Sequence, residues 1–427
     1  MRRTTSVCPI CLRRVPAVRV RRQGQYYLEK TCPEHGGFST LLWQGSQPLE
    51  DWTGPLPETG SEEGLRCPED CGLCKRHLRN TCCTLLEVTD RCNLNCRFCF
   101  ADNAQTQDPP LEQVKGWIDG IVRQTGGTLL QLSGGEPTLR DDLPQLVAYA
   151  KGAGCPYVQL NTNGLRLAEC PDFVHALAQA GLDIVFLQFD GMTEEVYHIL
   201  RGRDMLAAKQ AAIQACAREK IGVTLVPTLV PGVNTGQIGD ILRFAMSRTP
   251  DVRGVHFQPV SYFGRVPELP GDAQRYTMGQ LLDDIVGQTG GLIPRESLVP
   301  SSCDHPLCGL HGDYIALPRG RVYPLSNRNK PPAPCCGPAD PAQQNRDFIG
   351  SRWSRPEEAR CCPPESDLHS LDGFLAWKRA HGFTITSMNF QDAGNLDLER
   401  LRQCSLHVYR NGRRVPFCAA YLSPLAL

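Results

Sequence analysis

Residues 90–100 read DRCNLNCRFCF and place Cys92, Cys96 and Cys99 in the spacing C-x3-C-x2-C. Three thiolates in so short a run can hold three irons of a [4Fe-4S] cluster and leave the fourth iron open for another ligand. With cysteine at about 5% of positions, chance supplies about 0.06 such triplets in a chain of this length. This stretch therefore predicts an iron–sulfur site.

Short apolar runs alternate with helical patterns around these cysteines. Strands separated by helices of about 10 to 20 residues indicate βα units and a parallel sheet. Six strands are too few for a closed eight-stranded barrel and enough for an open one, so we expect an α/β fold with a partial (β/α)6 barrel. The expected strands are residues 84–89, 129–132, 157–160, 184–189, 223–229 and 255–257.

Composition excludes several classes of protein. The 427 residues hold 45 basic and 45 acidic side chains, so no net field favours nucleic acid. No run of 18 apolar residues predicts a membrane span, and the basic N-terminus lacks the apolar stretch of a secretory signal. The 22 cysteines fall in tight clusters, which favours metal binding in a cytoplasmic protein with reduced thiols over disulfide staples.

Changes in composition along the chain predict four regions. Residues 1–60 form a small metal-binding module, and residues 61–83 a cysteine-rich segment that carries an auxiliary cluster. Residues 84–290 form the partial barrel. Residues 291–427 form a C-terminal module with further iron–sulfur ligands. Within it, residues 330–364 are rich in Pro and Cys without periodicity, so we expect an inserted loop there and a helix within FLAWKRAHGF beyond it.

The segment CNLNCRFC, with Phe98 before the last cysteine, resembles the radical S-adenosylmethionine (SAM) superfamily, whose signature is C-x3-C-x-aromatic-C. SGGEPTL after the second expected strand, NTNG after the third and QFDG after the fourth agree with it. All of these motifs fall at carboxyl ends of strands, where barrel enzymes place their sites. The resemblance covers the central half of the chain.

The resemblance implies that the open iron chelates SAM and that one electron from the cluster releases a 5'-deoxyadenosyl radical. It also implies that a low-potential donor, flavodoxin or ferredoxin, reduces the cluster. The SAM contacts that it implies are Gly134, Gly135 and Glu136 at the methionyl amine, Pro137 shaping their turn, Asn161, Asn163 and Asp190 at strand ends, the signature aromatic Phe98, and Gln258 beside Phe257 near the adenine.

A second C-x3-C-x2-C triplet, Cys67, Cys71 and Cys74, lies just before the first. A second cluster is the natural interpretation, with Cys83, or less favourably Cys82, as fourth thiolate. A zinc knuckle or three unrelated thiols are the alternatives.

Cys8, Cys11, Cys32 and His35 form C-x2-C and C-x2-H pairs 20 residues apart. Four such ligands suit a closed tetrahedral site for one Zn or one rubredoxin-like Fe, with a structural or electron-relaying role.

Cys303, Cys308, Cys404 and Cys418 could converge on a further [4Fe-4S] cluster, although their spacing alone does not require it. The segments CPICLRR, KTCPEHG and CPEDCGLC, with the ending ITSMNFQDAGNLDLERLRQCSLHV and PFCAAY, resemble the branch of tetraether lipid synthases and methanopterin-ring methylases. That branch implies a radical SAM core with a rubredoxin-like site and two auxiliary clusters. Within this branch, the segments resemble the subgroup called radical SAM (seleno)protein TrsS.

The doublets Cys335–Cys336 and Cys361–Cys362 depart from this pattern. Adjacent cysteines are awkward ligands for one iron but can form vicinal disulfides or reactive thiol pairs. Exposed loop thiols or extra ligands are the alternative. The remaining cysteines Cys155, Cys170 and Cys216 fall in or near helical patterns and are most simply packing residues.

Three functions follow for testing. The first is a radical SAM enzyme that activates a C–H bond of an unknown organic substrate for C–C bond formation or methylation. The second is radical-based maturation, or sulfur or selenium transfer, with the doublets as donors or acceptors. The third is a non-enzymatic electron carrier with several clusters.

Overall fold

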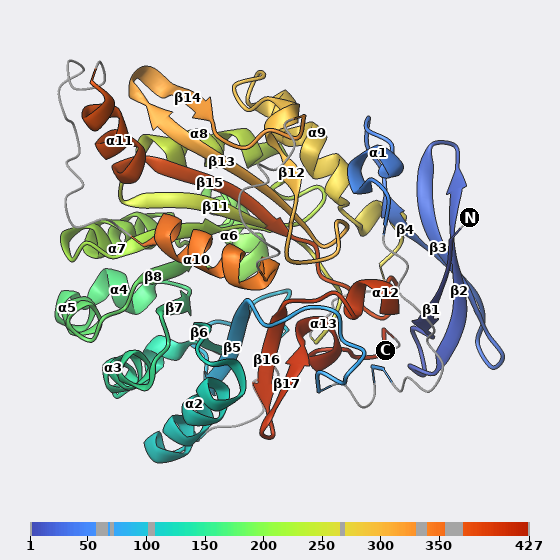
Figure 1. Ribbon diagram of the computed structural model, residues 1–427, viewed down its shortest axis with the longest axis horizontal. Helices are drawn as coiled ribbons and strands as arrows, with labels where there is room; N and C mark the ends of the chain where they lie inside the picture. The colour runs from blue at the N-terminus through green and yellow to red at the C-terminus, as the bar shows by residue number, and fades with distance from the viewer. Residues whose placement is uncertain are drawn as a thin grey trace.

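Two β-sheets organise the chain, one large and one small (Figure 1). The computed structural model describes residues 2–56, 67–68, 72–100, 107–264, 270–329, 340–354 and 370–425. The cysteine doublets and Cys71 lie outside these ranges.

The small sheet is an antiparallel ribbon at the N-terminus with the order β1-β2-β3-β4. Buried and less buried positions alternate along β2: Val15, Ala17 and Arg19 are buried on one face, whereas Pro16 and the last two arginines are exposed. Its strands are β1 (Arg2–Val7), β2 (Arg14–Arg22), β3 (Gln25–Cys32) and β4 (Gly36–Trp43).

Six parallel neighbours form the centre of the large sheet, in the order β5-β6-β7-β8-β9-β11. The six strands expected from the sequence are therefore confirmed. Pro227 has no N–H to donate and separates β9 from the short β10. Their bounds are β5 (Cys83–Thr89), β6 (Leu129–Gly134), β7 (Tyr157–Thr162), β8 (Ile184–Gln188), β9 (Gly222–Val226), β10 (Thr228–Leu229) and β11 (Val252–Pro259).

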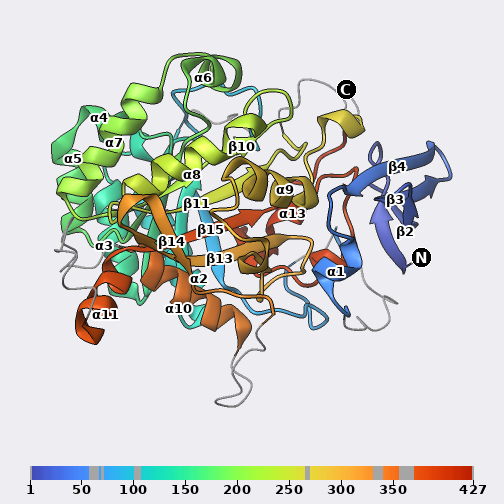
Figure 2. The same cartoon turned by 90° about the horizontal axis from the view of Figure 1, so that it is seen from above.

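Helices connect these strands and cover one face of the sheet (Figures 1 and 2). Glycines in the left-handed region end several of them; Gly126 ends α2 and Gly202 ends α6. The helices are α2 (Leu111–Thr125), α3 (Leu143–Ala153), α4 (Leu165–Glu169), α5 (Pro171–Gln179), α6 (Glu194–Arg201), α7 (Leu206–Arg218), α8 (Ile238–Ser247) and α9 (Met278–Gln288), and α1 (Leu49–Thr53) precedes them.

The C-terminal third continues the same sheet at both edges. β15 pairs with β11 in parallel, and β16 pairs with β5 in parallel. The outer strands β13 and β17 are antiparallel to these two. Strands from before and after the predicted boundary at residue 290 therefore belong to the same sheet. The added strands are β12 (Val299–Pro300), β13 (Gly309–Leu317), β14 (Arg321–Pro324), β15 (Gly382–Met388), β16 (Leu406–Arg410) and β17 (Arg413–Pro416).

The predicted insert at residues 330–364 contains a helix, so the expectation of a loop is wrong for α10 (Pro341–Trp353). Asp340 caps α10 by accepting from the backbone N–H of Ala342, and Pro341 occupies the first turn. The expected helix in FLAWKRAHGF is confirmed as α11 (Leu371–Ala380). The short helices α12 (Leu398–Leu401) and α13 (Phe417–Ala420) flank β16 and β17.

Candidate functional site

A cavity of about 290 Å³ lies inside the curved sheet. Inward-facing side chains from successive strands line it, among them Gln131, Gln159 and Gln188. One end is formed by the loops that follow the carboxyl ends of the strands, which is where the sequence motifs fall. The other end is closed by α10.

Cys92, Cys96 and Cys99 all line the first end of this cavity. Their loop leaves β5 and packs on Leu165 and Met205. Burial raises the pKa of the Cys92 thiol to about 11, and Glu136 and the other two thiols add to the effect. Three converging thiols with a cavity beside them suit a cluster that has one open iron.

Gly134 and Gly135 let the end of β6 close onto this loop. The φ of Gly134 is +129°, and a Cβ atom there would lie 2.0 Å from the carbonyl oxygen of Thr89. A Cβ on Gly135 would lie 2.3 Å from the carbonyl oxygen of Arg91. The amides of Gly135 and Glu136 donate to these two carbonyls at 2.8 Å each. The strand and the cysteine loop are thus fixed together.

The Glu136 carboxylate is buried and accepts hydrogen bonds from neighbouring residues of the protein. It accepts from the Thr162 hydroxyl and from the Asn163 amide, each at 2.7 Å, as well as from Thr138. It therefore fixes the end of β7. Pro137 begins a 3-10 helix (Pro137–Leu139) and does not line the cavity.

The remaining predicted SAM contacts divide into two groups. Phe98, Asn161, Asn163 and Gln258 line the cavity as expected. Asp190 does not: it is fully buried and forms a two-pronged ion pair with Arg201 at 2.6 and 2.7 Å.

Arg201 is a residue that the sequence interpretation missed. It lines the cavity at the end of α6, and its guanidinium hydrogen-bonds to Cys96. Burial would lower the pKa of Arg201, but Asp190 and Cys96 offset this and its pKa is raised, so it stays cationic. The signal in the sequence was weak, because Arg201 lies eleven residues after Asp190 in a segment, YHILRGR, that reads as an ordinary helix end.

Two family descriptions match the chain, "Radical SAM superfamily" at residues 86–245 and "HMPTM N-terminal zinc ribbon domain" at residues 1–44. The chain is 32% identical over 475 residues to 7,8-dihydro-6-hydroxymethylpterin dimethyltransferase of Methanocaldococcus jannaschii, and the alignment covers 98% of this chain and 92% of the relative. The chain belongs to the methylase-like branch of the radical SAM superfamily. The predicted branch is thereby confirmed; the narrower TrsS assignment stays a prediction.

Other similarities are shorter. A probable GTP 3',8-cyclase of Thermococcus kodakarensis is 34% identical over 170 residues, which cover 38% of this chain and 52% of the relative. The crystal structure of Streptococcus suis SuiB bound to precursor peptide SuiA matches with a TM-score of 0.42 at 15% identity, covering 50% of this chain and 48% of that chain.

As a member of the radical SAM superfamily, the chain is an enzyme, so the electron-carrier alternative is not supported. The family uses a [4Fe-4S] cluster, SAM and a reductant. The donor set of Cys92, Cys96 and Cys99 fits this cluster. Among the described residues, no helix has the length and apolar character that crossing a membrane requires.

The far end of the radical SAM cavity carries a second group of thiols. Cys82, Cys83 and Cys303 line it together with Asp304 and, from α10, Asn345. This placement corrects the expectation for Cys83, whose thiol donates to Gln131 Oε1 at 3.3 Å inside the barrel. Cys82 and Cys303 hydrogen-bond to each other, so Cys303 is paired with a residue outside its predicted set.

Cys67 and Cys74 lie together elsewhere, around a small pocket that His77 also lines. His77 is partly buried and bonds to the carbonyl oxygen of Cys404 at 2.7 Å. Cys71 cannot be placed with them, since it lies outside the described residues.

Three of the four predicted C-terminal ligands lie near one another: Cys308 and Cys418 are buried and Cys404 is half-buried. Burial and then the Asp304 carboxylate raise the pKa of Cys404 most, and the thiols of Cys418 and Cys308 raise it further. The Arg400 guanidinium donates to Cys308 Sγ at 3.4 Å. The arrangement therefore joins residues that are up to 110 positions apart in the chain.

The predicted N-terminal metal ligands lie close together. Among the described residues, Cys8, Cys11, Cys32 and His35 are the one group whose ligand atoms lie within 4.8 Å of one another. The turns after β1 and β3 carry the two pairs, as the C-x2-C and C-x2-H spacings predict. Four converging S and N ligands could hold one tetrahedral metal ion.

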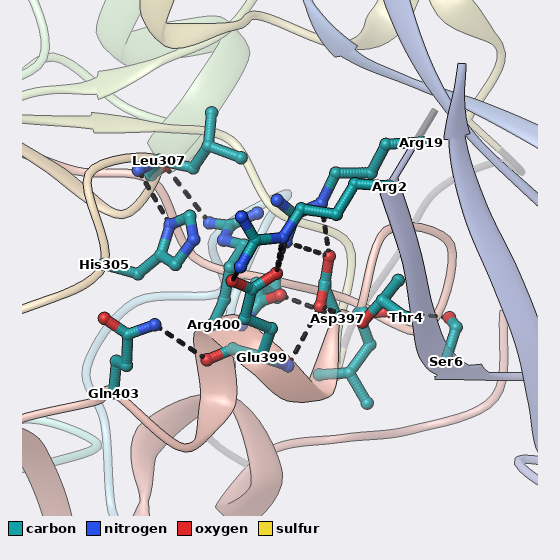
Figure 3. Close-up of polar contacts among 12 residues, drawn as sticks. Arg2, Thr4, Ser6, Arg19, His305, Leu307, Asp397, Glu399, Arg400 and Gln403 are labelled. Carbon is teal, nitrogen blue, oxygen red and sulfur yellow. Dashed lines mark hydrogen bonds and ion pairs between the residues drawn. The ribbon is translucent and has the colours of Figure 1, made fainter. Parts of the chain in front are cut away.

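A buried ion cluster fastens this ribbon to the C-terminal segment (Figure 3). Arg19 donates to Asp397 at 2.6 and 2.8 Å and to Glu399 at 2.8 Å. Burial would raise the pKa of Asp397, but Arg19 and Thr4 offset this and its pKa is lowered. Val7 of the ribbon also packs in one cluster with Cys67 and Cys418. The N-terminal metal set is thus held beside the other cysteines.

Proposed function

We propose that this radical SAM enzyme methylates, or otherwise forms a C–C bond at, an unactivated carbon of a small, flat and neutral heterocycle. The observation that carries the proposal is the cavity that begins at Cys92, Cys96 and Cys99 and continues through the barrel. It gives a radical formed at one end direct access to a molecule held in the interior, away from bulk water.

The chain's own residues prepare the first end for SAM. Cys92, Cys96 and Cys99 hold the cluster, which when bound supplies the electron that cleaves SAM. The amides of Gly135 and Glu136 are already bonded to the cysteine loop, so the carbonyl groups of this turn are left to accept from the methionyl ammonium. Asn161, Asn163 and Gln258 offer polar contacts deeper in the cavity.

The interior suits an uncharged heterocycle. Gln131, Gln159 and Gln188 form an amide wall that can pair with ring N–H and carbonyl groups. Gln159 Oε1 is buried without a hydrogen-bond partner among the described residues, which leaves an acceptor for a ligand donor.

Aromatic rings provide the floor of the cavity. The ring centroids of Phe186 and Trp353 lie 5.0 Å apart, and those of Phe186 and His256 lie 5.1 Å apart. Burial lowers the pKa of His256 to about 3, so this imidazole is neutral. The M. jannaschii relative is named for a pterin, and we propose a pterin-like ring as the substrate class.

Two auxiliary [4Fe-4S] clusters complete the proposal, one at Cys67, Cys71 and Cys74 and one at Cys308, Cys404 and Cys418. Zinc is proposed at Cys8, Cys11, Cys32 and His35, because the matching family description names a zinc ribbon. We further propose flavodoxin or ferredoxin as the reductant and the cytoplasm as the location, where the described cysteines, all free of disulfides, stay reduced.

The alternative of maturation, or of sulfur or selenium transfer, depends on the two cysteine doublets. They lie outside the described residues, so this alternative stays a prediction.

The test is anaerobic reconstitution followed by metal counting and assay for 5'-deoxyadenosine, with 7,8-dihydro-6-hydroxymethylpterin as probe substrate. About twelve irons and one zinc, with a methylated pterin product, are the expected result. About four irons would restrict the clusters to Cys92, Cys96 and Cys99. Absence of 5'-deoxyadenosine from the wild type under all conditions contradicts the radical mechanism.

A further inference from the structure

Two thiols that line the cavity, Cys82 and Cys303, lie outside the triplet Cys92, Cys96 and Cys99. Cys82 and Cys303 are 5% and 2% exposed and hydrogen-bond to each other, and both line the same cavity as Cys92, Cys96 and Cys99. One comes from the residue before β5 and the other from the loop before β13. The fold therefore brings together two thiols that are 221 positions apart.

Each thiol has its own fixed polar partner. Cys303 Sγ donates to Asp304 Oδ2 at 3.2 Å. The second oxygen of this carboxylate accepts from the Ser405 amide at 2.7 Å and from the Ser405 hydroxyl at 2.9 Å. Cys82 Sγ accepts from Asn345 Nδ2 at 3.3 Å. A base thus stands beside one thiol and only a donor beside the other.

Cys82 and Cys303 are arranged as a pair of thiols. Cys83, the third thiol nearby, is turned toward Gln131. Two thiols in contact with each other are placed for a disulfide.

We propose that Cys82 and Cys303 form a redox-active dithiol that donates a hydrogen atom to the radical formed on the substrate. This inference rests on the proposed function, because it needs a substrate radical in the cavity. The pair would end the reaction inside the same cavity that holds the substrate radical.

The step balances as follows in atoms and electrons. The S–H bond of Cys82 breaks, the substrate carbon gains a C–H bond, and a thiyl radical is left on Cys82. Cys303 passes its proton to Asp304, and its sulfur bonds to that of Cys82 as a disulfide radical anion. The cluster that Cys92, Cys96 and Cys99 would hold, oxidised by one electron after SAM cleavage, would accept the extra electron. An external dithiol then restores both thiols with two electrons and two protons.

The experiment compares Cys82→Ser, Cys303→Ser and Cys303→Ala with the wild type under anaerobic conditions. Cys170→Ser is the matched control, since Cys170 is a half-buried thiol between α4 and α5 and does not line the cavity. Iron content, 5'-deoxyadenosine and methylated pterin are measured on each protein. Oxidation with diamide followed by peptide mass spectrometry maps disulfides.

The dithiol predicts a Cys82–Cys303 cross-linked peptide in the wild type and in the control, and unchanged iron in every variant. With the pterin probe, the Cys82 and Cys303 variants should continue to form 5'-deoxyadenosine and lose methylated product. Retained methylation in these variants overturns the proposal.

Two other results overturn it whether or not the pterin is turned over. One is the absence of the cross-link, and the other is a loss of about four irons in a Cys82 or Cys303 variant, which would make these residues cluster ligands. Failure of the proposed function is separate: the wild type then makes no 5'-deoxyadenosine or no methylated pterin, while the cross-link and the iron counts still decide the dithiol.

Discussion

The chain contains the C-x3-C-x2-C spacing twice, in surroundings that differ sharply. Cys92, Cys96 and Cys99 follow β5 and open into the cavity. In the other triplet, Cys74 is exposed and Cys67 faces a small pocket apart from the barrel interior. Spacing thus predicts how many thiolates a segment offers, whereas the chemistry depends on the space beside them.

The largest effect is expected at the first triplet. Cys96→Ala should lose about four irons and reduce 5'-deoxyadenosine to background, because a cluster ligand is removed. The measurement is iron content together with product assay, and Cys170→Ser is the control. Full SAM cleavage by Cys96→Ala would contradict the assignment.

Substitution of Arg201 tests whether the cation beside Cys96 contributes to SAM cleavage at the first triplet. Arg201→Leu removes the cation beside Cys96 and leaves Asp190 buried without its partner. We expect 5'-deoxyadenosine formation to fall about 10- to 100-fold, as is usual for residues that orient metal ligands.

The electron paramagnetic resonance spectrum of the reduced cluster distinguishes an effect of Arg201 on the cluster from an effect on folding alone. The spectrum should change in Arg201→Leu and return toward that of the wild type in Arg201→Lys, which keeps the charge. An unchanged spectrum with lower activity would assign Arg201 to folding alone.

The second triplet should matter less for SAM cleavage. Cys74→Ser is expected to lose about four irons while 5'-deoxyadenosine continues to form, since this site does not border the cavity. Equal loss of SAM cleavage in Cys74→Ser and Cys96→Ala would remove the distinction between the two triplets.

The smallest effect on SAM cleavage is expected from the ribbon junction, where the change appears in stability. Asp397→Asn leaves Arg19 buried without its full counter-charge, which costs about 3 to 5 kcal/mol of unfolding free energy. Thermal denaturation measures the loss. A neutral result would mean that packing alone holds the ribbon.

The same junction has a predictable pH dependence. The folded-state pKa of Asp397 is lowered, so its stabilising contribution is complete above the pKa of an unfolded aspartate and is lost as the pH falls through the lower folded value. Thermal stability of the wild type should therefore decrease more steeply in acid than that of Asp397→Asn.

Local patterns predicted much of the molecule. The six central strands and the N-terminal metal set follow from periodicity and from ligand spacing. The cavity-lining residues Asn161, Asn163 and Gln258 follow from the resemblance to the radical SAM superfamily. Cys155 and Cys216 are buried in the main core, as expected for packing residues.

Contacts that depend on tertiary structure could not be predicted. Cys83 was grouped with its near neighbours in sequence, but β5 turns its thiol into the barrel. Arg201 acts through Asp190 and Cys96, which only the fold brings together. The helix α10 could not be predicted from the sequence, because the Pro and Cys residues around it indicate a loop more strongly than Asp340 and Pro341 indicate the start of a helix.

The pairing of β16 with β5 also sets the order of events during synthesis. Leu406 aligns with Cys83, more than 300 residues earlier in the chain. Contacts of such long range slow folding, and until β16 has been synthesised the β5 edge lacks this partner and is open to aggregation. The cluster proposed at Cys404 and Cys418 could therefore form only after this C-terminal segment has been synthesised.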